Sequence, residues 1–320
     1  MDHMQPPDNT PGWERKALEK LAFEALAEQK SRRRWGVFFK FLGFAYLGVV
    51  LVTAVEWGGA GDQQHEHTAM VSLQGVIEAR GEASGENLVS ALTAAFEAPK
   101  SVGVILRINS PGGSPVQAGI VNDEIRRLRG KYPDKPLYAV VEDVCASGGY
   151  YVAVAADKIY VDKASIVGSI GVLMDGFGFT GTMDKLGVER RLMTAGQNKG
   201  FMDPFSPQAD VQKAHAQALL DDIHRQFIEV VRAGRGERLK ETPEIFSGLV
   251  WTGAQSVQLG LADAFGSVDS VARDVIKVDK VLDYSVRDNI AERFAKRLGA
   301  GAVDSLWQGI SARLATWSLR

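Results

Sequence analysis

The stretch VGVILRINSPGGSPV, residues 102–116, combines three local signals that together decide the fold class. Residues 102–108 are rich in Val, Ile and Leu, which is typical of a strand buried on both faces of a parallel sheet. A turn with two adjacent glycines follows, and Ser114 with Pro115 then predicts the start of a helix, as N-cap and first helical residue. The stretch therefore predicts a strand, a tight turn and a helix in direct succession.

A second stretch, PLYAVVEDVCASGGYYVA at residues 136–153, has the same order of signals. Its apolar run predicts a strand, and Ser147 before Gly148 and Gly149 predicts a turn into a helix. In a parallel sheet both turns emerge at the carboxyl edge of the strands, where α/β proteins place their sites. Free N–H groups at the two helix starts would suit an oxyanion, a phosphate or a thioester carbonyl equally well.

Strand and helix signals alternate on both sides of these stretches, which predicts an α/β protein with a mostly parallel sheet and helices on its faces. Strands are expected at residues 70–77, 102–108, 136–144, 158–162, 165–174 and 188–194. Helices are expected at residues 85–98, 114–130, 147–156 and 206–232, the last capped by Ser206. After Gly248 a helix, a short strand and another helix complete the pattern.

The composition excludes few functions. The 320 residues suffice for one large domain or two, and the net charge of −2 gives no reason to expect nucleic acid as a partner. Cys145 is the single cysteine, so it cannot form an internal disulfide. We interpret it as a buried core residue rather than a nucleophile.

An apolar run from Trp35 to Trp57 follows the basic residues Lys30, Arg32, Arg33 and Arg34. About 20 helical residues cross a bilayer, so the run predicts an uncleaved transmembrane anchor. The positive-inside rule then places residues 1–34 in the cytoplasm and the chain after Gly58 outside. A cleaved signal peptide and a buried globular helix are the alternatives.

The resulting domain plan has five parts: a cytoplasmic tail (1–34), the anchor (35–57), a linker (58–68), an extracytoplasmic domain (69–284) and a C-terminal amphipathic segment (285–320). His65 and His67 fall in the linker, where two histidines are too few for a metal site. We therefore expect them to be solvated, and no metal or other cofactor is predicted.

Ser147 at a helix start is the candidate nucleophile, and a serine hydroxyl needs a base to react. His215 and His224 lie in the expected helix 206–232 among polar residues, so we interpret them as surface residues. Lys199 is the alternative base, in the glycine-containing loop TAGQNKGFMDPFSP at residues 194–207. A lysine acts as a base only when neutral, a form that apolar neighbours such as Phe201 favour.

The ordered motifs INSPGG, ASGGYYVA, VGSIGV, the loop with Lys199 and WTGAQSVQLGLAD resemble the bacterial signal peptide peptidase (protease IV) family. The resemblance spans about residues 70–275 and implies a membrane-anchored serine peptidase with a crotonase-like, Clp-protease-like fold of repeated ββα units. It implies Ser147 as nucleophile and Lys199 as general base. It also implies oxyanion donors from Gly112 or Gly113 with Gly148, and Ser169 holding the lysine amine.

The family also implies a place and an assembly. Its short, single-unit members complete the Ser–Lys dyad between neighbouring subunits of a ring, so a homo-oligomer is expected. The expected location is the bacterial plasma membrane, with apolar, signal-peptide-like peptides as substrates. Two other functions stay open: an acyl-CoA hydratase or isomerase that uses the same oxyanion hole, and a non-catalytic membrane scaffold that kept the fold.

Overall fold

The computed structural model describes residues 13–57 and 65–286. The chain divides into two compact units, with the boundary between Gln63 and Gln64. The first contains one long helix, α1 (Trp13–Trp57), with exposed apolar side chains such as Phe41 and Phe44. Within the described residues, no helix is both long and apolar enough to cross a membrane. The predicted anchor extends to side chains 51–57, which lie outside the described set, as do residues 1–12 and 58–64.

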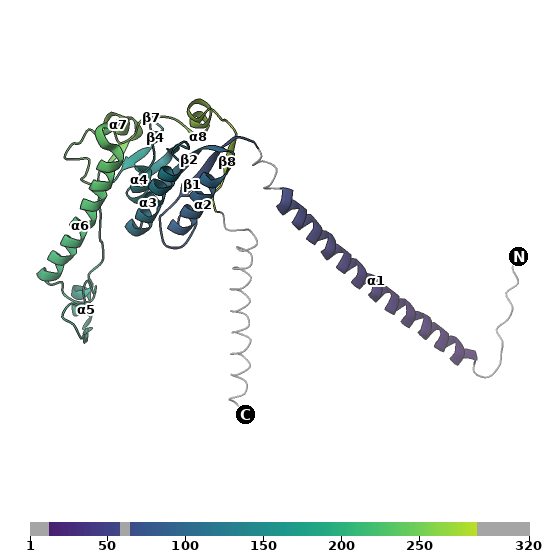
Figure 1. Ribbon diagram of the computed structural model, residues 1–320. Helices are drawn as coiled ribbons and strands as arrows, with labels where there is room; N and C mark the ends of the chain where they lie inside the picture. The colour runs from purple at the N-terminus through teal and green to yellow at the C-terminus, as the bar shows by residue number, and fades with distance from the viewer. Residues whose placement is uncertain (1–12, 58–64, 287–320) are drawn as a thin grey trace. The chain divides into compact units, whose positions relative to one another are not determined.

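The second unit is built on one sheet of eight strands (Figure 1). The main path runs β6 (Val250–Thr252), β5 (Ile166–Gly168), β3 (Leu137–Ala146), β2 (Ser101–Ser110), β1 (His67–Gln74) and β8 (Val281–Asp283). The remaining strands, β4 (Lys158–Val161) and β7 (Ala264–Phe265), extend from the other end of β3. All pairs are parallel except β5 with β6. The prediction of an α/β protein with a mostly parallel sheet is confirmed.

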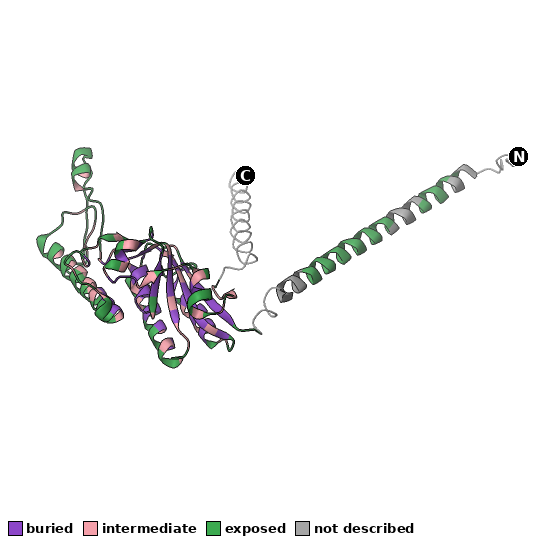
Figure 2. Cartoon of the chain, turned by 90° about the horizontal axis from the view of Figure 1, so that it is seen from above, coloured by how far each residue is buried: buried purple, intermediate pink, exposed green. Residues whose placement is uncertain are grey.

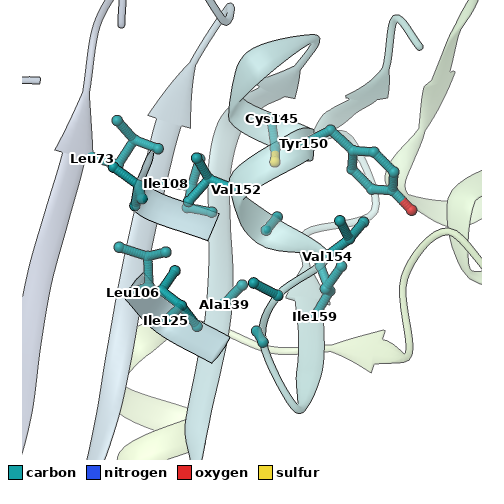
Figure 3. Close-up of a cluster of buried hydrophobic side chains, with 14 of the residues drawn as sticks. Leu73, Leu106, Ile108, Ile125, Ala139, Cys145, Tyr150, Val152, Val154 and Ile159 are labelled. Carbon is teal, nitrogen blue, oxygen red and sulfur yellow. The ribbon is translucent and has the colours of Figure 1, made fainter. Parts of the chain in front are cut away.

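Helices α2 (Gly85–Glu97), α3 (Pro115–Lys131) and α4 (Gly148–Ala153) bury one face each in the main core. Figure 3 shows this core, where Leu106 and Ile108 of β2 lie near Ile125 of α3 and Val152 of α4. Figure 2 shows the buried residues concentrated in the sheet and on the helix faces against it. The start of α3 is as expected, because Ser114 Oγ accepts the Gln117 N–H and Pro115 opens the helix.

A second, smaller cluster packs Ile105, Val140 and Tyr160 against Val271 and Ala272. The last two belong to a short helical segment, η3 (Val271–Ile276), which follows α8 (Val268–Ser270). The main core and this cluster together bury both faces of the central strands, which explains the apolar composition of β2.

Helix α6 (Asp210–Arg235) is fixed to the sheet at its C-terminal end. The guanidinium of Arg235, only 1% exposed, donates to both carboxylate oxygens of Asp263 (2.8 and 3.0 Å) and to the Gly260 carbonyl (2.8 Å). Asp263 also accepts the N–H of Ile159 in β4 (2.7 Å). This buried ion pair holds the helix whose middle residues line the candidate site.

Four local predictions were wrong. The expected strand 165–174 is only three residues long as β5, and residues 188–194 form no strand, because their exposed side chains have no sheet to pair with. The long helix begins at Asp210 rather than Ser206, since Ser206 Oγ donates to Asp203 (2.7 Å) instead of capping a helix. His67 is fully buried in β1, and its Nε2 bonds the Tyr284 hydroxyl (2.8 Å), so it is not a solvated linker residue.

The remaining short elements come from the C-terminal part of the sheet domain. Helix α7 (Gly253–Gln258) follows β6 with a complete capping box between Thr252 and Gln255. Helix α5 (Thr180–Leu186) ends at Gly187, and η2 (Gly236–Arg238) follows α6. The expected C-terminal amphipathic segment lies outside the described residues from position 287 onward.

Candidate active site

Ser147 adopts a backbone conformation that few residues other than glycine adopt. It connects β3 to α4 with φ 52° and ψ −124°. Its N–H donates to the Gly168 carbonyl of β5 (2.8 Å), and its own carbonyl accepts the Tyr151 N–H (2.9 Å). Such a conformation costs about 1–3 kcal/mol and persists only where its surroundings enforce it. The two hydrogen bonds therefore hold a strained turn that presents the serine side chain.

The SPGG turn lies directly against this serine. A Cβ on Gly112, at φ 101°, would come within 2.7 Å of both Ser147 Cβ and the Gly148 nitrogen. A Cβ on Gly113, at φ 145°, would come within 2.1 Å of the Ile77 carbonyl oxygen. Both positions therefore require glycine, for conformation and for space. The close approach explains why the two glycine turns belong to one site.

Hydrogen bonding decides which N–H groups face the serine. Gly112 N–H donates to Ser110 Oγ (3.2 Å), so it has a partner within the turn. The residues on either side of Gly113 both bind the backbone of Ile77. The Gly112 carbonyl accepts the Ile77 N–H (2.8 Å), and the Ser114 N–H donates to the Ile77 carbonyl (2.8 Å). The N–H of Gly113 therefore points away from Ile77, and its nitrogen lies 3.3 Å from the position of a Cβ on Gly148. Neither Gly113 N–H nor Gly148 N–H has an acceptor among the described residues.

A second serine, Ser169, also has a positive φ, of 50°. Its N–H donates to the Leu249 carbonyl (2.8 Å) just before β6. The preceding Gly168, at φ 117°, lies against Trp251, where a Cβ would approach the indole Cδ1 to 3.1 Å. Because Gly168 also accepts the Ser147 N–H, β6 supports the backbone of both serines.

Trp251 is a part of this support that the sequence analysis did not single out. Its indole N–H is buried and has no acceptor among the described residues. The residue was visible only within the motif WTGAQ, whose pattern indicates a helix start and says nothing about contact with residues 168 and 169. The pairing of Val167 with Trp251 across β5 and β6 creates that contact.

A cavity of about 920 Å³ opens above Ser147. Four predicted site residues line it: Gly113, Ser147, Gly148 and Ser169. Most of its other walls are apolar, formed by Val116, Ile120, Tyr151, Val172, Leu173, Ile223 and Phe227. An apolar cavity with a serine and two unpaired amide donors can bind a peptide and stabilise an oxyanion.

Lys199 does not line this cavity. It is exposed in residues 173–209, a segment without a buried residue that we call the arm. Figure 1 shows α5, which belongs to the arm, away from the strands of the sheet. The described chain thus brings Ser147, Ser169 and the glycines together but does not bring Lys199 to them. The Ser147–Lys199 dyad stays a prediction.

The alternative nucleophile, Cys145, and the alternative bases, His215 and His224, lie outside the cavity at Ser147. Cys145 is fully buried in the main core, where burial raises the pKa of its thiol, so its interpretation as a core residue is confirmed. His215 is exposed and contacts the Phe201 ring (5.7 Å between centroids). His224 is partly buried and bonds the Ile170 carbonyl through Nε2 (3.2 Å). Neither histidine lines the cavity.

Comparison with known proteins identifies the domain. The family model for peptidase family S49 matches residues 130–282, which include Ser147, Ser169, Lys199 and Trp251. Residues 130–282 are therefore similar to peptidase family S49. Family S49 comprises serine peptidases, and the mixed α/β sheet with helices described above fits the S49 fold.

Three relatives illustrate the match. A Haemophilus influenzae protein named Protease 4 is 30% identical over 231 residues, which cover 71% of this chain and 37% of that protein. An Enterococcus faecium protein that carries the name signal peptide peptidase SppA is 29% identical over 252 residues, 76% of this chain and 72% of that one. A Brucella melitensis protein named Na(+)/H(+) antiporter NhaA is 43% identical over 209 residues, 64% of this chain. This chain spans only 28% of that last relative, whose name therefore describes a much longer protein.

Proposed function

We propose that this chain is a serine endopeptidase that cleaves apolar peptides with Ser147 as nucleophile. The observation that carries the proposal is the strained turn at Ser147, beside the unpaired N–H groups of Gly113 and Gly148 in an apolar cavity. Strained backbone at a functional position is typical of a preorganised site. No cofactor is needed for the reaction.

The proposed chemistry proceeds in two steps. Neutral Lys199 accepts the Ser147 hydroxyl proton while Oγ attacks the substrate carbonyl, whose developing negative charge Gly113 and Gly148 N–H groups stabilise. The C–N bond then breaks, and the leaving nitrogen takes the proton from Lys199. In the second step water gives a proton to Lys199, attacks the acyl ester and releases Ser147 Oγ, which recovers that proton. Ser169, at the cavity wall, would hold the lysine amine, and Gly112 would allow the close approach of the turns.

We further propose that the lysine comes from a neighbouring copy of the chain. Lys199 is exposed, and the arm also exposes large apolar side chains, among them Leu173, Phe177, Leu186 and Met193. Exposed apolar surface of this kind marks interaction sites. Association of copies through the arm would cover this surface and surround the lysine with apolar groups, which favours its neutral form. The expected assembly is therefore a homo-oligomer, as a ring of identical subunits would provide.

The membrane location belongs to the same proposal. Residues 35–57, at the end of α1, would anchor the chain in the bacterial plasma membrane, with the N-terminus in the cytoplasm and the crotonase-like, repeated ββα domain outside. A site near the outer leaflet would meet apolar peptides that remain in the membrane, such as cleaved signal peptides. The basic residues before Trp35 support this orientation.

Cleavage of an apolar fluorogenic peptide by the purified full chain tests the proposed function. Ser147→Ala should lower kcat by roughly 10⁴-fold or more, as removal of a catalytic nucleophile does. Cys145→Ala is the matched control two residues away, and it should cleave at the wild-type rate. If Ser147→Ala cleaves as fast as the wild type, or if the wild type cleaves no peptide, the proposed function is wrong.

A further inference from the structure

Three residues on one face of helix α3 line the wall of the cavity. Val116, Ile120 and Asp123 are spaced four and three residues apart, so they lie on one face of the helix. All three line the cavity. Val116 and Ile120 are 68% and 46% exposed, so the cavity wall presents apolar surface to solvent. The same face therefore presents an apolar surface that ends in a carboxylate.

Asp123 is the only charged residue among those that line the cavity in the described chain. The other lining residues are uncharged, and Val172, Leu173, Ile223 and Phe227 among them are apolar. Asp123 is itself exposed, so it lies where the cavity meets solvent. An apolar cleft with a single acid at its mouth is complementary to an apolar ligand with one cationic end.

No ion pair of Asp123 occurs within residues 13–57 and 65–286. Its neighbour Glu124 differs, because it pairs with Arg127 (2.7 Å) on another face of the helix. Arg126, one turn beyond Asp123, does not line the cavity. Tyr151, which does line it, has a pKa raised by burial and further by the Asp123 charge, while the Arg126 charge lowers it. Asp123 is therefore the charged side chain of this helix that lines the cavity.

We propose that Asp123 binds a lysine or arginine side chain of the substrate, so that the cleft selects peptides in which a basic residue adjoins an apolar run. The inference rests on the proposed peptidase function and names its substrate class. The apolar stem of a lysine would lie along Val116 and Ile120 while its ammonium reaches the carboxylate. An ion pair at such a partly exposed position corresponds to a preference of roughly two- to fivefold.

A charge series tests this inference on the purified full chain. Apolar peptides identical except for one Lys, Gln or Glu, moved stepwise along the residues flanking the apolar run, are compared by kcat/KM. The wild type should prefer Lys over Gln, and Gln over Glu, at one position of the series. The Lys-to-Gln ratio should fall to about one in Asp123→Asn and persist in Asp123→Glu. Asp123→Lys should reverse the order and favour the Glu peptide.

Asp134→Asn is the matched control, since Asp134 is an exposed acid that does not line the cavity. It should keep the wild-type ratio. A wild type without charge preference at any position, or a preference that survives in Asp123→Asn, would overturn the inference. Binding of the same uncleaved peptides to Ser147→Ala, followed by fluorescence anisotropy, gives the charge preference without catalysis. A protein that binds the Lys peptide best but cleaves none would contradict the proposed function and support the inference.

Discussion

The turn around Ser147 and the arm that carries Lys199 are built in opposite ways. The turn is enclosed by β2, β3 and β5, and its conformation is held by hydrogen bonds to Gly168 and Tyr151. The arm has no buried residue between positions 173 and 209, and it exposes side chains as large as Phe177. The nucleophile of the proposed dyad is therefore held by the fold, whereas the described residues bury no side chain around the proposed base.

Removal of the proposed base tests this difference between the turn and the arm directly. Lys199→Ala should lower kcat/KM by about 10³-fold or more, as the loss of an essential base does. A mixture of Lys199→Ala with Ser147→Ala should regain activity if the dyad forms between copies, because each assembly would then contain intact pairs. Peptide cleavage before and after mixing measures the recovery.

Lys185→Ala is the control, since Lys185 is also exposed and belongs to α5 within the arm. It should retain activity. If the mixture of the two inactive variants stays inactive while both form wild-type oligomers, the idea of a shared dyad fails. An active Lys199→Ala protein would remove Lys199 from the mechanism altogether.

Among the substitutions that test stability, loss of the Arg235–Asp263 pair should destabilise the sheet domain most. Arg235→Met leaves the Asp263 carboxylate largely buried, with Arg238 (3.2 Å) as its one remaining charged partner among the described residues, and should lower the free energy of unfolding by about 3 kcal/mol. Urea denaturation measures the change. Arg225→Met, which removes an exposed pair with Asp222, should change it by less than about 1 kcal/mol.

The same pair predicts the acid sensitivity of the fold. Burial alone would raise the pKa of Asp263, but the bonds from Arg235 and Ile159 N–H and the charges of Arg235 and Arg238 outweigh it, so the pKa is lowered. A lowered pKa stabilises the fold above the unfolded value of about 4, and this contribution disappears as the pH falls through the folded value. Asp263→Asn should therefore flatten the loss of stability below about pH 4. An unchanged acid profile in this variant would exclude Asp263 as the cause.

A substitution in the contact between the two glycine turns should lower the free energy of unfolding nearly as much. Gly113→Ala would force a Cβ to within 2.1 Å of the Ile77 carbonyl and should lower the free energy of unfolding by about 2–3 kcal/mol. Gly130→Ala, in α3 with open space around it, should instead stabilise by about 0.5–1 kcal/mol. Thermal denaturation of both variants gives the comparison, and equal melting temperatures would contradict the close packing of the turn.

The smallest effect concerns the strain at Ser147 itself. Ser147→Gly should raise the free energy of unfolding by about 1 kcal/mol, because glycine adopts φ 52° without the steric cost, while peptidase activity is lost. Ser147→Ala keeps a Cβ at the same angle and should leave stability close to wild type. A gain in stability in both variants would mean that the hydroxyl, and not the backbone, carries the strain.

The sequence by itself determined the class of fold and most of one half of the site. Apolar runs before glycine doublets predict buried parallel strands, and the doublets must emerge at one sheet edge, so Gly113, Ser147 and Gly148 could be grouped from local patterns alone. The burial of Cys145 was also predictable, because a small apolar residue at the end of a core strand has few other places to lie.

Only the tertiary structure decided which amides are free, what supports Ser169 and where α6 begins. The Gly112 N–H is occupied by Ser110 Oγ, and Trp251 reaches Gly168 through an antiparallel pairing across more than 80 positions of chain. Such contacts depend on strand order, which local periodicity does not encode. The arm shows the same limit: residues 188–194 were predicted as a strand, but a strand needs a neighbour, and the described part of the chain provides none.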